Sequence, residues 1–223
     1  MRSITFVRHG QSTANIGAVS VPHADIPLSL LGQAQAQVLA SCLPAQPALV
    51  LASPYLRAQD TAQPYSLQWG QAVQTDTLLH ELDAIAYERI VGMDGTQRTE
   101  VAAAYWQAAD PDLCTGAQAE TFAAFVQRVQ RFRTQRLPQL PDNCVVFGHG
   151  IWIAMLCWQL WGFAAEGRQG MQQFRRFQQG WPMPNGASYR VQGDGLAPWS
   201  VQIDARVMQR LDVLEQHAPA GVQ

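Results

Sequence analysis

The sequence predicts an α/β fold in which a mainly parallel sheet lies between two layers of helices. Short apolar runs of strand length alternate along the chain with longer segments of helical character. The runs are apolar at nearly every position, which is typical of strands buried on both faces of a parallel sheet. The 223 residues, 48% of them hydrophobic, suffice for one domain with a substantial core.

The expected strands are the short apolar runs bounded by turn-forming residues. They cover residues 3–8, 49–53, 72–75, 144–147, 187–192 and 199–203. Asn185-Gly186 predicts a turn immediately before the last two of these strands, because Asn-Gly favours the backbone of a tight turn. The order of strands and helices along the chain is that of an α/β/α sandwich.

The expected helices begin or end at recognisable signals. Ser29 is expected to cap the first helix, and Pro54 to occupy the first turn of the second, which ends at Pro64. Residues 164–184 combine Gly, Gln, Arg and Pro, and they predict no regular element. Helices are expected over residues 29–43, 54–64, 101–109, 121–137, 151–161 and 205–216.

One domain is expected over residues 1–223, because no internal repeat and no linker divides the chain. Within it, the helical middle, about residues 83–140, is less apolar than the rest and is expected to form a lid over the site. The chain opens directly into its first strand, so we expect no signal peptide and a cytoplasmic protein. Residues 144–163 are almost uncharged, but a Gly-His-Gly sequence interrupts them, and a strand, turn and helix are favoured over a membrane span.

Charge and composition argue against several classes of function. The 15 cationic residues and 17 acidic residues give a net charge of −2, which offers no reason to expect nucleic-acid or anionic-membrane binding. All 15 cationic residues are Arg, and the absence of Lys excludes Schiff-base chemistry and a Walker A phosphate site. The four cysteines form no C-x-x-C pair, and His and carboxylates show no metal-ligand spacing. We therefore expect reduced structural cysteines, no metal and no cofactor.

Polar residues of particular types stand at the carboxyl ends of three expected strands. Arg8 and His9 follow the first strand, Arg57 lies one helical turn past the second, and His149 follows a late one. In α/β sheets these strand ends converge on one crevice, where ligands bind. Two guanidinium groups in one pocket repel each other unless an anion joins them, and Arg matches phosphate in a bidentate manner. A phosphoryl group is therefore the expected ligand, although any one of these residues taken alone fits a structural role better.

Several segments resemble motifs of the histidine phosphatase superfamily, which is also called phosphoglycerate mutase-like. Arg8-His-Gly-Gln-Ser-Thr-Ala-Asn15 resembles the R-H-G-x-S-x-x-N signature, and residues 53–62 resemble S-P-x-x-R-[AT]-x-x-T-A. Further matches in the family's order lie at residues 28–35, 79–83, 120–128 and 145–150. The resemblance spans residues 4–192 and implies the family's three-layer fold.

The resemblance implies a metal-independent phosphomonoesterase that hydrolyses a small organic phosphate through a phosphohistidine on His9. Ser12 either helps in the same loop or serves only as a turn residue. Backbone N–H groups at the start of the Gly150–Ile151 helix are expected to add donors to the phosphate, because helix N-termini favour anions. The phosphate-binding residues that the resemblance implies are Arg8, Asn15, Arg57, His149 and Gly150.

The general acid and base is expected within residues 79–83. Motif alignment favours Glu81, and Asp83 is the competitor, because both side chains point to the same side of an extended segment. A carboxyl that donates a proton near neutral pH needs a raised pKa, so an apolar flank and limited solvent are expected around Glu81. His80 is expected to be structural, and His23 lies in a loop that could overhang the pocket.

Two other functions stay open. One is a phosphoglycerate-type mutase, but the superfamily's mutases carry Trp before the signature Asn and a Lys in the substrate site, whereas this chain has Ala14 and no Lys. The other is a phosphate-binding fold without turnover, which the complete set of site residues disfavours.

The expected partner is a small phosphorylated metabolite whose identity the sequence does not give. The helical middle and residues 164–184 are expected to cover the pocket, and their aromatic and Arg residues suggest an organic phosphate of modest size, with a second anionic group left open. These residues are Tyr87, Arg89, Tyr105, Trp106, Arg175, Arg176 and Trp181. A homodimer through the Trp-rich late segment is also left open.

Overall fold

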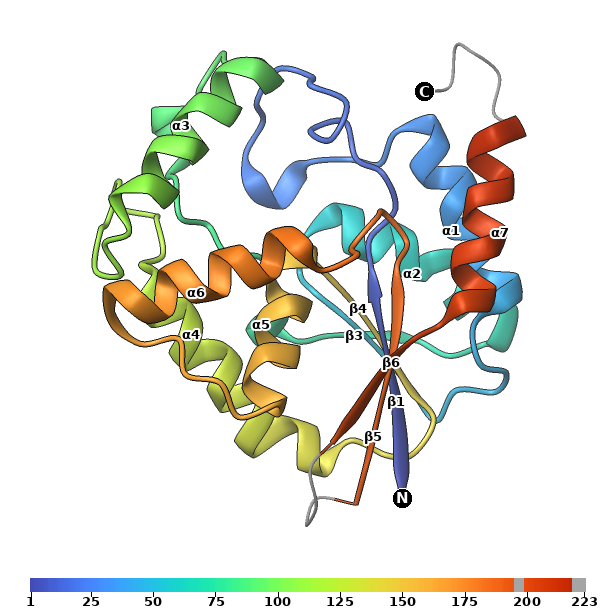
Figure 1. Cartoon of the computed structure of the whole chain (residues 1–223). Coiled ribbons are helices and arrows are strands. Elements are labelled where there is room, and N and C mark those ends of the chain that lie inside the picture. The colour runs from blue at the N-terminus through green and yellow to red at the C-terminus, as the bar shows by residue number, and fades with distance from the viewer. Residues whose placement is uncertain (195–198, 218–223) are drawn as a thin grey trace.

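A single six-stranded sheet forms the centre of the computed structural model, which describes residues 1–194 and 199–217 (Figure 1). The strands follow the order β3-β2-β4-β1-β5-β6 across the sheet. Their bounds are β1 Arg2–Arg8, β2 Leu49–Ala52, β3 Val73–Thr75, β4 Cys144–Gly148, β5 Ser188–Gly193 and β6 Ser200–Ile203.

The sheet is mainly parallel, as the sequence predicts. β1 pairs in parallel with β4, with Ile4 opposite Cys144 and Arg8 opposite Gly148, and β2 pairs in parallel with both β4 and β3. β5 runs antiparallel to β1 and to β6. Because β1, β2 and β4 run the same way, their carboxyl ends and the residues that follow them meet at one edge of the sheet.

Helices cover both faces of the sheet (Figure 1). The helices α1, α2 and α7 lie on one side and α4, α5 and α6 on the other, whereas α3 lies near the end of the sheet at which β1 terminates. Their bounds are α1 Leu30–Cys42, α2 Leu56–Trp69, α3 Gly95–Ala108, α4 Phe122–Arg131, α5 Gly150–Leu160, α6 Gly167–Gly180 and α7 Ala205–His217.

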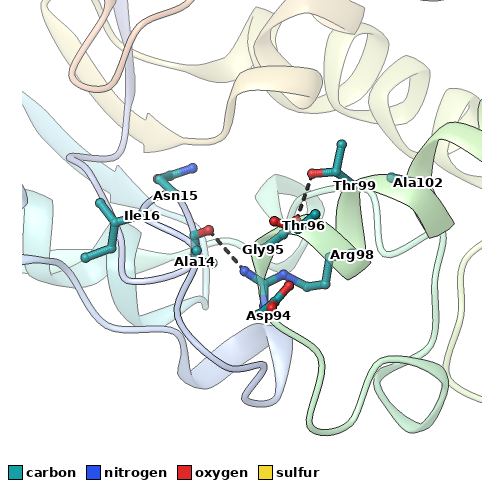
Figure 2. Close-up of a pocket in the computed structure, with 10 residues that line it drawn as sticks. Ala14, Asn15, Ile16, Asp94, Gly95, Thr96, Arg98, Thr99 and Ala102 are labelled. Carbon is teal, nitrogen blue, oxygen red and sulfur yellow. Dashed lines mark hydrogen bonds between the residues drawn. The ribbon is translucent and has the colours of Figure 1, made fainter.

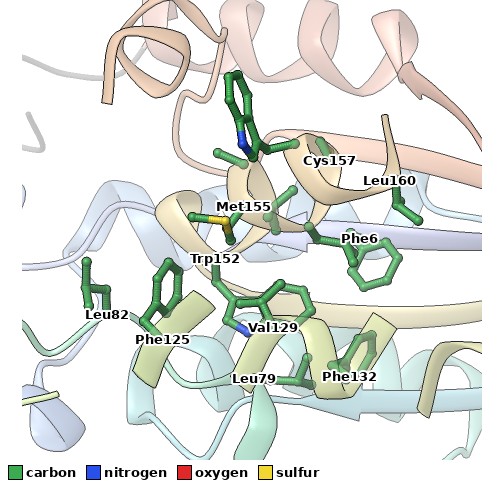
Figure 3. Close-up of a cluster of buried hydrophobic side chains, with 14 of the residues drawn as sticks. Phe6, Leu79, Leu82, Phe125, Val129, Phe132, Trp152, Met155, Cys157 and Leu160 are labelled. Carbon is green, nitrogen blue, oxygen red and sulfur yellow. The ribbon is translucent and has the colours of Figure 1, made fainter. Parts of the chain in front are cut away.

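The larger hydrophobic core lies between the sheet and α4, α5 and α6 (Figure 3). Trp152 is at its centre: its ring stacks on Phe6 at 6.0 Å between centroids and meets the edge of Phe132 at 4.9 Å. The indole N–H donates to the carbonyl of Leu78 at 2.8 Å. Through this hydrogen bond the core holds the backbone of the segment that leads to Glu81. Burial of aromatic rings dominates the packing energy of such a core.

Two expected helix boundaries are wrong. α2 begins at Leu56, so Pro54 precedes the helix, and α2 continues through Pro64 to Trp69. A proline inside a helix removes one hydrogen bond, but the turn beyond it is anchored by Tyr65, which is fully buried against Phe147 and donates its hydroxyl to Pro44. The helix ends instead at Gly70, whose positive φ of 63° suits glycine.

Other expectations are corrected in the middle and late parts of the chain. α3 begins at Gly95, six residues before the expected start, because Asp94 and Gln97 form a capping box there. The helix expected over 121–137 changes to a π-helical turn at Phe132–Arg136. Residues 164–184, for which no element was predicted, contain α6, whose apolar residues Met171 and Phe174 pack into the larger core.

The cysteines are free, as expected from their spacing, and two of them, Cys144 and Cys157, are buried. Cys114 is exposed, so it is not a core residue. Among residues 1–194 and 199–217, no helix combines the length and the apolar character that a membrane crossing requires.

Candidate active site

Of the residues singled out at the strand ends, Arg8, His9 and Arg57 line one cavity of about 470 Å³. Arg8 ends β1 and His9 follows it, Arg57 is the second residue of α2, and His149 joins β4 to α5. Loop residues and the end of α6 close the cavity on the remaining sides. Its lining includes Arg8, His9, Ser12, Asn15, Arg57, Glu81 and Gly150. His149 lies directly behind, with its ring 5.3 Å from the ring of His9 between centroids.

His9 is held in one tautomer. Its Nδ1 lies 2.7 Å from the carbonyl oxygen of Gly10, and because a carbonyl only accepts hydrogen bonds, Nδ1 carries the proton. The lone pair is then on Nε2, which accepts from Nε of Arg57 at 3.2 Å. The side chain is only 5% exposed. This arrangement leaves the unprotonated ring nitrogen of a cavity-lining residue beside a fixed positive charge.

Both histidines are held neutral by their surroundings. Burial, followed by the charges of Arg57 and Arg8, lowers the pKa of His9 well below its ordinary value. Burial and the charge of Arg57 do the same to the pKa of His149. Nε2 of His149 is within 2.8 Å of the hydroxyl of Ser53, while its buried Nδ1 has no hydrogen-bond partner among the described residues. That nitrogen is a buried polar atom with unused hydrogen-bonding capacity, in a ring that lies against His9.

The two guanidinium groups are positioned by backbone carbonyls. Arg57 donates through Nη1 to the carbonyl of His23 at 2.7 Å, and its guanidinium lies 5.0 Å over the ring of Tyr55. Arg8 donates through Nη1 to the carbonyl of Met183. Burial lowers the pKa of both groups, and the nearby charge of Glu81 opposes this effect. Arg remains charged in proteins, so two fixed cations face one cavity.

Asn15 is oriented by a set of donors that the sequence analysis did not foresee. Its Oδ1 accepts from the backbone N–H and the hydroxyl of Ser12, both at 2.9 Å, and from Nδ2 of Asn185 at 3.1 Å. With the oxygen engaged three times, the amide nitrogen is the group that remains for a ligand. Ser12 is therefore a positioning residue, and Asn185, predicted only as part of a turn, is another.

Glu81 occupies the N-terminus of α5. Its Oε2 accepts from the N–H of Ile151 at 3.0 Å, and its Oε1 accepts from the N–H groups of Trp152 and Leu82, each at 3.0 Å. Of the N–H groups at the start of this helix that were expected to serve phosphate, that of Ile151 is bonded to Glu81, as is that of Trp152. Gly150 lines the cavity close to Arg8: a Cβ on Gly150 would be 3.3 Å from Nε of Arg8.

The pKa of Glu81 is raised above its ordinary value. Burial raises it, and the backbone N–H groups of Ile151 and Leu82 and the charges of Arg57 and Arg8 oppose the shift without cancelling it. The raised pKa is the property required of a proton donor near neutral pH. Glu81 is partly exposed to the cavity, so its proton can reach a bound ligand.

Asp83 differs from Glu81 in its hydrogen-bond partners. The hydroxyl of Tyr55 donates to its carboxylate, and Asp83 does not line the cavity. The sequence could not show this difference, because it depends on a residue 28 positions away. Glu81 is therefore the better-placed acid.

The segment before Glu81 is clamped by Arg128 of α4. This buried guanidinium donates through Nη1 to the carbonyls of Leu78 and His80 at 2.8 and 2.7 Å. It also forms a bidentate pair with Glu120, with N–O distances of 2.7 and 2.6 Å. The clamp fixes the backbone that carries Glu81.

The remaining candidates lie away from the reacting groups. Nε2 of His23 contacts the carbonyl of Ile85 at 2.8 Å, and Nδ1 of His80 contacts that of Glu81 at 2.9 Å. Of the aromatic and Arg residues expected over the pocket, Trp181 lines it. Arg175 stacks instead on Trp106 at 4.6 Å. Gln178, Gln179 and Met183 also line the cavity, and no sequence motif marked them.

A phosphoglycerate mutase-like α/β/α fold with two histidines, two arginines and a capping glutamate at the carboxyl ends of its strands defines the histidine phosphatase class of hydrolases. The chain belongs to the histidine phosphatase superfamily (branch 1), whose family model matches residues 4–191. This match confirms the family resemblance of the sequence motifs.

Curated relatives support the same membership. The chain is 32% identical over 182 residues to the adenosylcobalamin/α-ribazole phosphatase of Escherichia coli, covering 78% of this chain and 85% of that protein. It is 38% identical over 81 residues to the glucosyl-3-phosphoglycerate phosphatase of Mycobacterium tuberculosis. That second match spans 36% of either chain, so about a third of the length of that relative is matched.

Solved structures show the same fold. A structure described as an α-ribazole-5′-phosphate phosphatase of Escherichia coli superposes with a TM-score of 0.69 at 25% identity, covering 91% of this chain and 96% of that one. A mycobacterial glucosyl-3-phosphoglycerate phosphatase gives a TM-score of 0.66 at 24% identity, with coverage of 91% and 97%. At such identities the second likeness concerns the fold alone.

Proposed function

We propose that the protein is a phosphomonoesterase that hydrolyses a small organic phosphate through a phosphohistidine on His9, with Glu81 as general acid and base. The observation that carries the proposal is the geometry of His9. Its Nδ1 proton is bound to the Gly10 carbonyl, so the lone pair is on Nε2, and His9 lines the cavity together with Arg57, whose Nε donates to that nitrogen. A neutral imidazole in this orientation is an activated nucleophile.

In the first step Nε2 of His9 attacks phosphorus and the bond from phosphorus to the ester oxygen breaks. Arg8, Arg57, the amide of Asn15 and Nδ1 of His149 hold the equatorial oxygens, and their fixed charges and dipoles stabilise the transition state. Glu81 gives its proton to the leaving oxygen, which departs as an alcohol.

In the second step the ionised Glu81 takes a proton from water. The resulting hydroxide attacks phosphorus, the phosphorus–nitrogen bond breaks, and inorganic phosphate leaves. Glu81 again carries its proton and His9 regains its lone pair, so the cycle closes with no other reactant. Glu81 lines the cavity, and this position supports both roles for one carboxyl.

A mutase is the second candidate, and no feature of the site favours it. The position before Asn15 is Ala14, a small residue that lines both this cavity and a neighbouring one.

The expected cytoplasmic location, the homodimer, the division into a core and a lid at 83–140, and the small-metabolite partner stay proposals.

The test is release of nitrophenol from para-nitrophenyl phosphate in excess EDTA, with His9→Ala beside the wild type. We expect turnover that survives EDTA and falls by at least about 10³-fold in the variant, because the covalent route is lost. His217→Ala is the matched control, since His217 is exposed at the end of α7. Activity abolished by EDTA, or retained in His9→Ala, would overturn the proposal.

A direct test is to trap the intermediate. Brief exposure to a ³²P-labelled ester, followed by denaturation in alkali, should leave label on the protein that acid releases, as expected for a phosphorus–nitrogen bond. Wild type and His217→Ala should carry the label and His9→Ala should not. Label that is stable in acid would place the phosphoryl group on an oxygen and contradict the assignment.

A further inference from the structure

We call the cavity that contains His9 and Arg57 the phosphate cavity. A second cavity, of about 660 Å³, shares the lining residues Ala14 and Asn15 with it. We call this second cavity, whose lining is drawn in Figure 2, the outer cavity. We infer that the outer cavity receives the alcohol part of the substrate, and that this part is a neutral, hydroxyl-rich group without a carboxylate or second phosphate. The inference rests on the proposed function and narrows its substrate class.

The walls of the outer cavity are the loop 14–17 and the N-terminal turns of α3 (Figure 2). The two walls touch at a pair of glycines: the N–H of Gly95 donates to the carbonyl of Gly17 at 3.0 Å. A Cβ on Gly95 would lie 2.6 Å from the Cα of Gly17, closer than any side chain allows. The loop that carries Asn15 is therefore docked directly on α3, and the two cavities keep a fixed relation.

Arg98 joins the same two walls through hydrogen bonds to neutral groups of the protein. Its Nη2 donates to the carbonyl of Ala14 at 3.2 Å, and its Nη1 contacts the carbonyls of Ala18 and Met93 at 2.6 and 2.9 Å. Nη1 also lies 3.2 Å from the hydroxyl of Ser20. Although Arg98 lines the outer cavity, its guanidinium is bonded to the protein and a ligand anion would have to displace these contacts.

The remaining polar groups of the outer cavity suit hydroxyls. Thr96 and Thr99 bring hydroxyl groups, and Asn15 brings an amide. The N-terminus of α3 is already neutralised by an anion, since the Asp94 carboxylate accepts from the N–H of Gln97 at 2.9 Å. A sugar-like alcohol can donate to Asp94 and accept from Thr96. The Thr99 hydroxyl already donates to the carbonyl of Gly95 at 2.8 Å, so it can only accept from such a ligand.

Among the described residues, the lining of the outer cavity offers an anion no net positive charge. Its charged side chains are Arg98 and Asp94, while Arg8 and Arg57 face His9 in the other cavity. A carboxylate in the outer cavity would meet the Asp94 carboxylate, and it would compete with the carbonyl oxygens that Arg98 already binds. The second anionic group left open by the sequence is thus disfavoured: Arg89 and Arg176 are exposed outside both linings, and Arg175 is stacked on Trp106.

The test uses two esters that differ at one carbon. Glucose 1-phosphate carries a CH₂OH group where glucuronic acid 1-phosphate carries a carboxylate. We expect wild-type kcat/KM to favour the neutral ester by about tenfold or more, a factor that corresponds to about 1.4 kcal/mol. If neither ester is hydrolysed, their inhibition constants against para-nitrophenyl phosphate give the same ratio.

Asp94→Asn removes the charge and keeps a residue that caps helices well. We expect it to reduce the preference for the neutral ester by about 3- to 10-fold, mainly by improving the acidic one, which corresponds to about 0.7–1.4 kcal/mol. Asp212→Asn changes net charge equally on exposed α7 and should leave the preference unchanged. Thr96→Val, which removes a hydroxyl and no charge, should weaken both esters alike.

Equal or better use of the acidic ester by the wild type would overturn the inference. So would an unchanged preference in Asp94→Asn, or binding of neither ester more tightly than inorganic phosphate. Each of these results differs from failure of the proposed function, which the EDTA-resistant, His9-dependent release of nitrophenol reports separately.

Discussion

The phosphate cavity and the outer cavity are built in different ways. The phosphate cavity is assembled from strand ends and the first turns of α2 and α5, and its His9 and Arg57 are almost completely buried. The outer cavity is formed by a surface loop and the exposed start of α3. The chemistry thus rests on the sheet, whereas the choice of alcohol rests on a peripheral helix that can change without disturbing the sheet.

The largest effect is expected from the acid. Glu81→Gln cannot donate a proton, so kcat/KM for an alkyl phosphate should fall by about 10²–10⁴. Burial raises the pKa of Glu81, so the wild-type acid is loaded until pH rises through that raised value, which sets the alkaline limb of the pH profile. Burial lowers the pKa of His9, so the acid limb lies well below the ordinary value for His. A pH series of kcat/KM measures both limbs.

Dinitrophenyl phosphate sharpens this prediction, because its leaving group departs without a proton. Glu81→Gln should still release a burst of about one dinitrophenol per enzyme before stalling at the second step. Asp83→Asn is the rival variant and should keep the alkaline limb. If the limb disappears in Asp83→Asn and persists in Glu81→Gln, the acid has been misassigned.

An intermediate effect is expected from the clamp. Arg128→Met releases the carbonyls of Leu78 and His80, and kcat should fall by about 10- to 100-fold with little change in KM, because small displacements of a catalytic group are costly. The alkaline limb should also move, since the surroundings of Glu81 change. The free energy of unfolding should fall by about 3–5 kcal/mol, because Glu120 loses its partner in a largely buried pair.

Arg131→Met, on the exposed face of the same helix, is the matched control for the clamp. Urea denaturation of both variants shows whether the loss of kcat exceeds the unfolded fraction. A loss of activity fully accounted for by unfolding, with an unmoved alkaline limb, would reduce Arg128 to a purely structural residue.

The smallest effect is expected at the junction of the two cavities. Gly95→Ala forces α3 away from Gly17 and should cost about 1–3 kcal/mol of stability, the usual range for overpacking. Turnover of glucose 1-phosphate should fall roughly 3- to 10-fold and more than that of para-nitrophenyl phosphate, since the outer cavity is deformed directly and the phosphate cavity only through the loop of Asn15. Gly180→Ala, where a Cβ has open space, is the control. Equal losses with both substrates would mean that the two cavities are not separable.

The sequence was most informative where function depends on short motifs at strand ends. The succession of strands along the chain, and the convergence of Arg8, His9, Arg57 and His149, follow from apolar runs and the residues after them. α6 was missed because its glycines and glutamines obscure the apolar spacing of Met171 and Phe174.

Contacts between distant segments were not predictable. The bonds of Asn185 to Asn15 and of Tyr55 to Asp83 join positions 170 and 28 residues apart. Each depends on how loops pack, which no local pattern records. The same reason explains why the outer cavity was not foreseen: it exists only because two glycines, far apart in the sequence, let a loop and a helix touch.

The burial of Glu81, His9 and His149 makes the free energy of unfolding depend on pH. The pKa of Glu81 is raised in the folded state, so the unfolded chain ionises first and stability is lost as pH rises through the folded value. The pKa values of His9 and His149 are lowered, so the unfolded chain binds protons first and stability is lost as pH falls below about 6.5. Between the ordinary pKa values of Glu and His, the folded protein holds a protonated acid and two neutral histidines, whereas the unfolded chain would carry a carboxylate and two imidazolium ions. The protonation states that the proposed cycle requires therefore cost the folded protein stability.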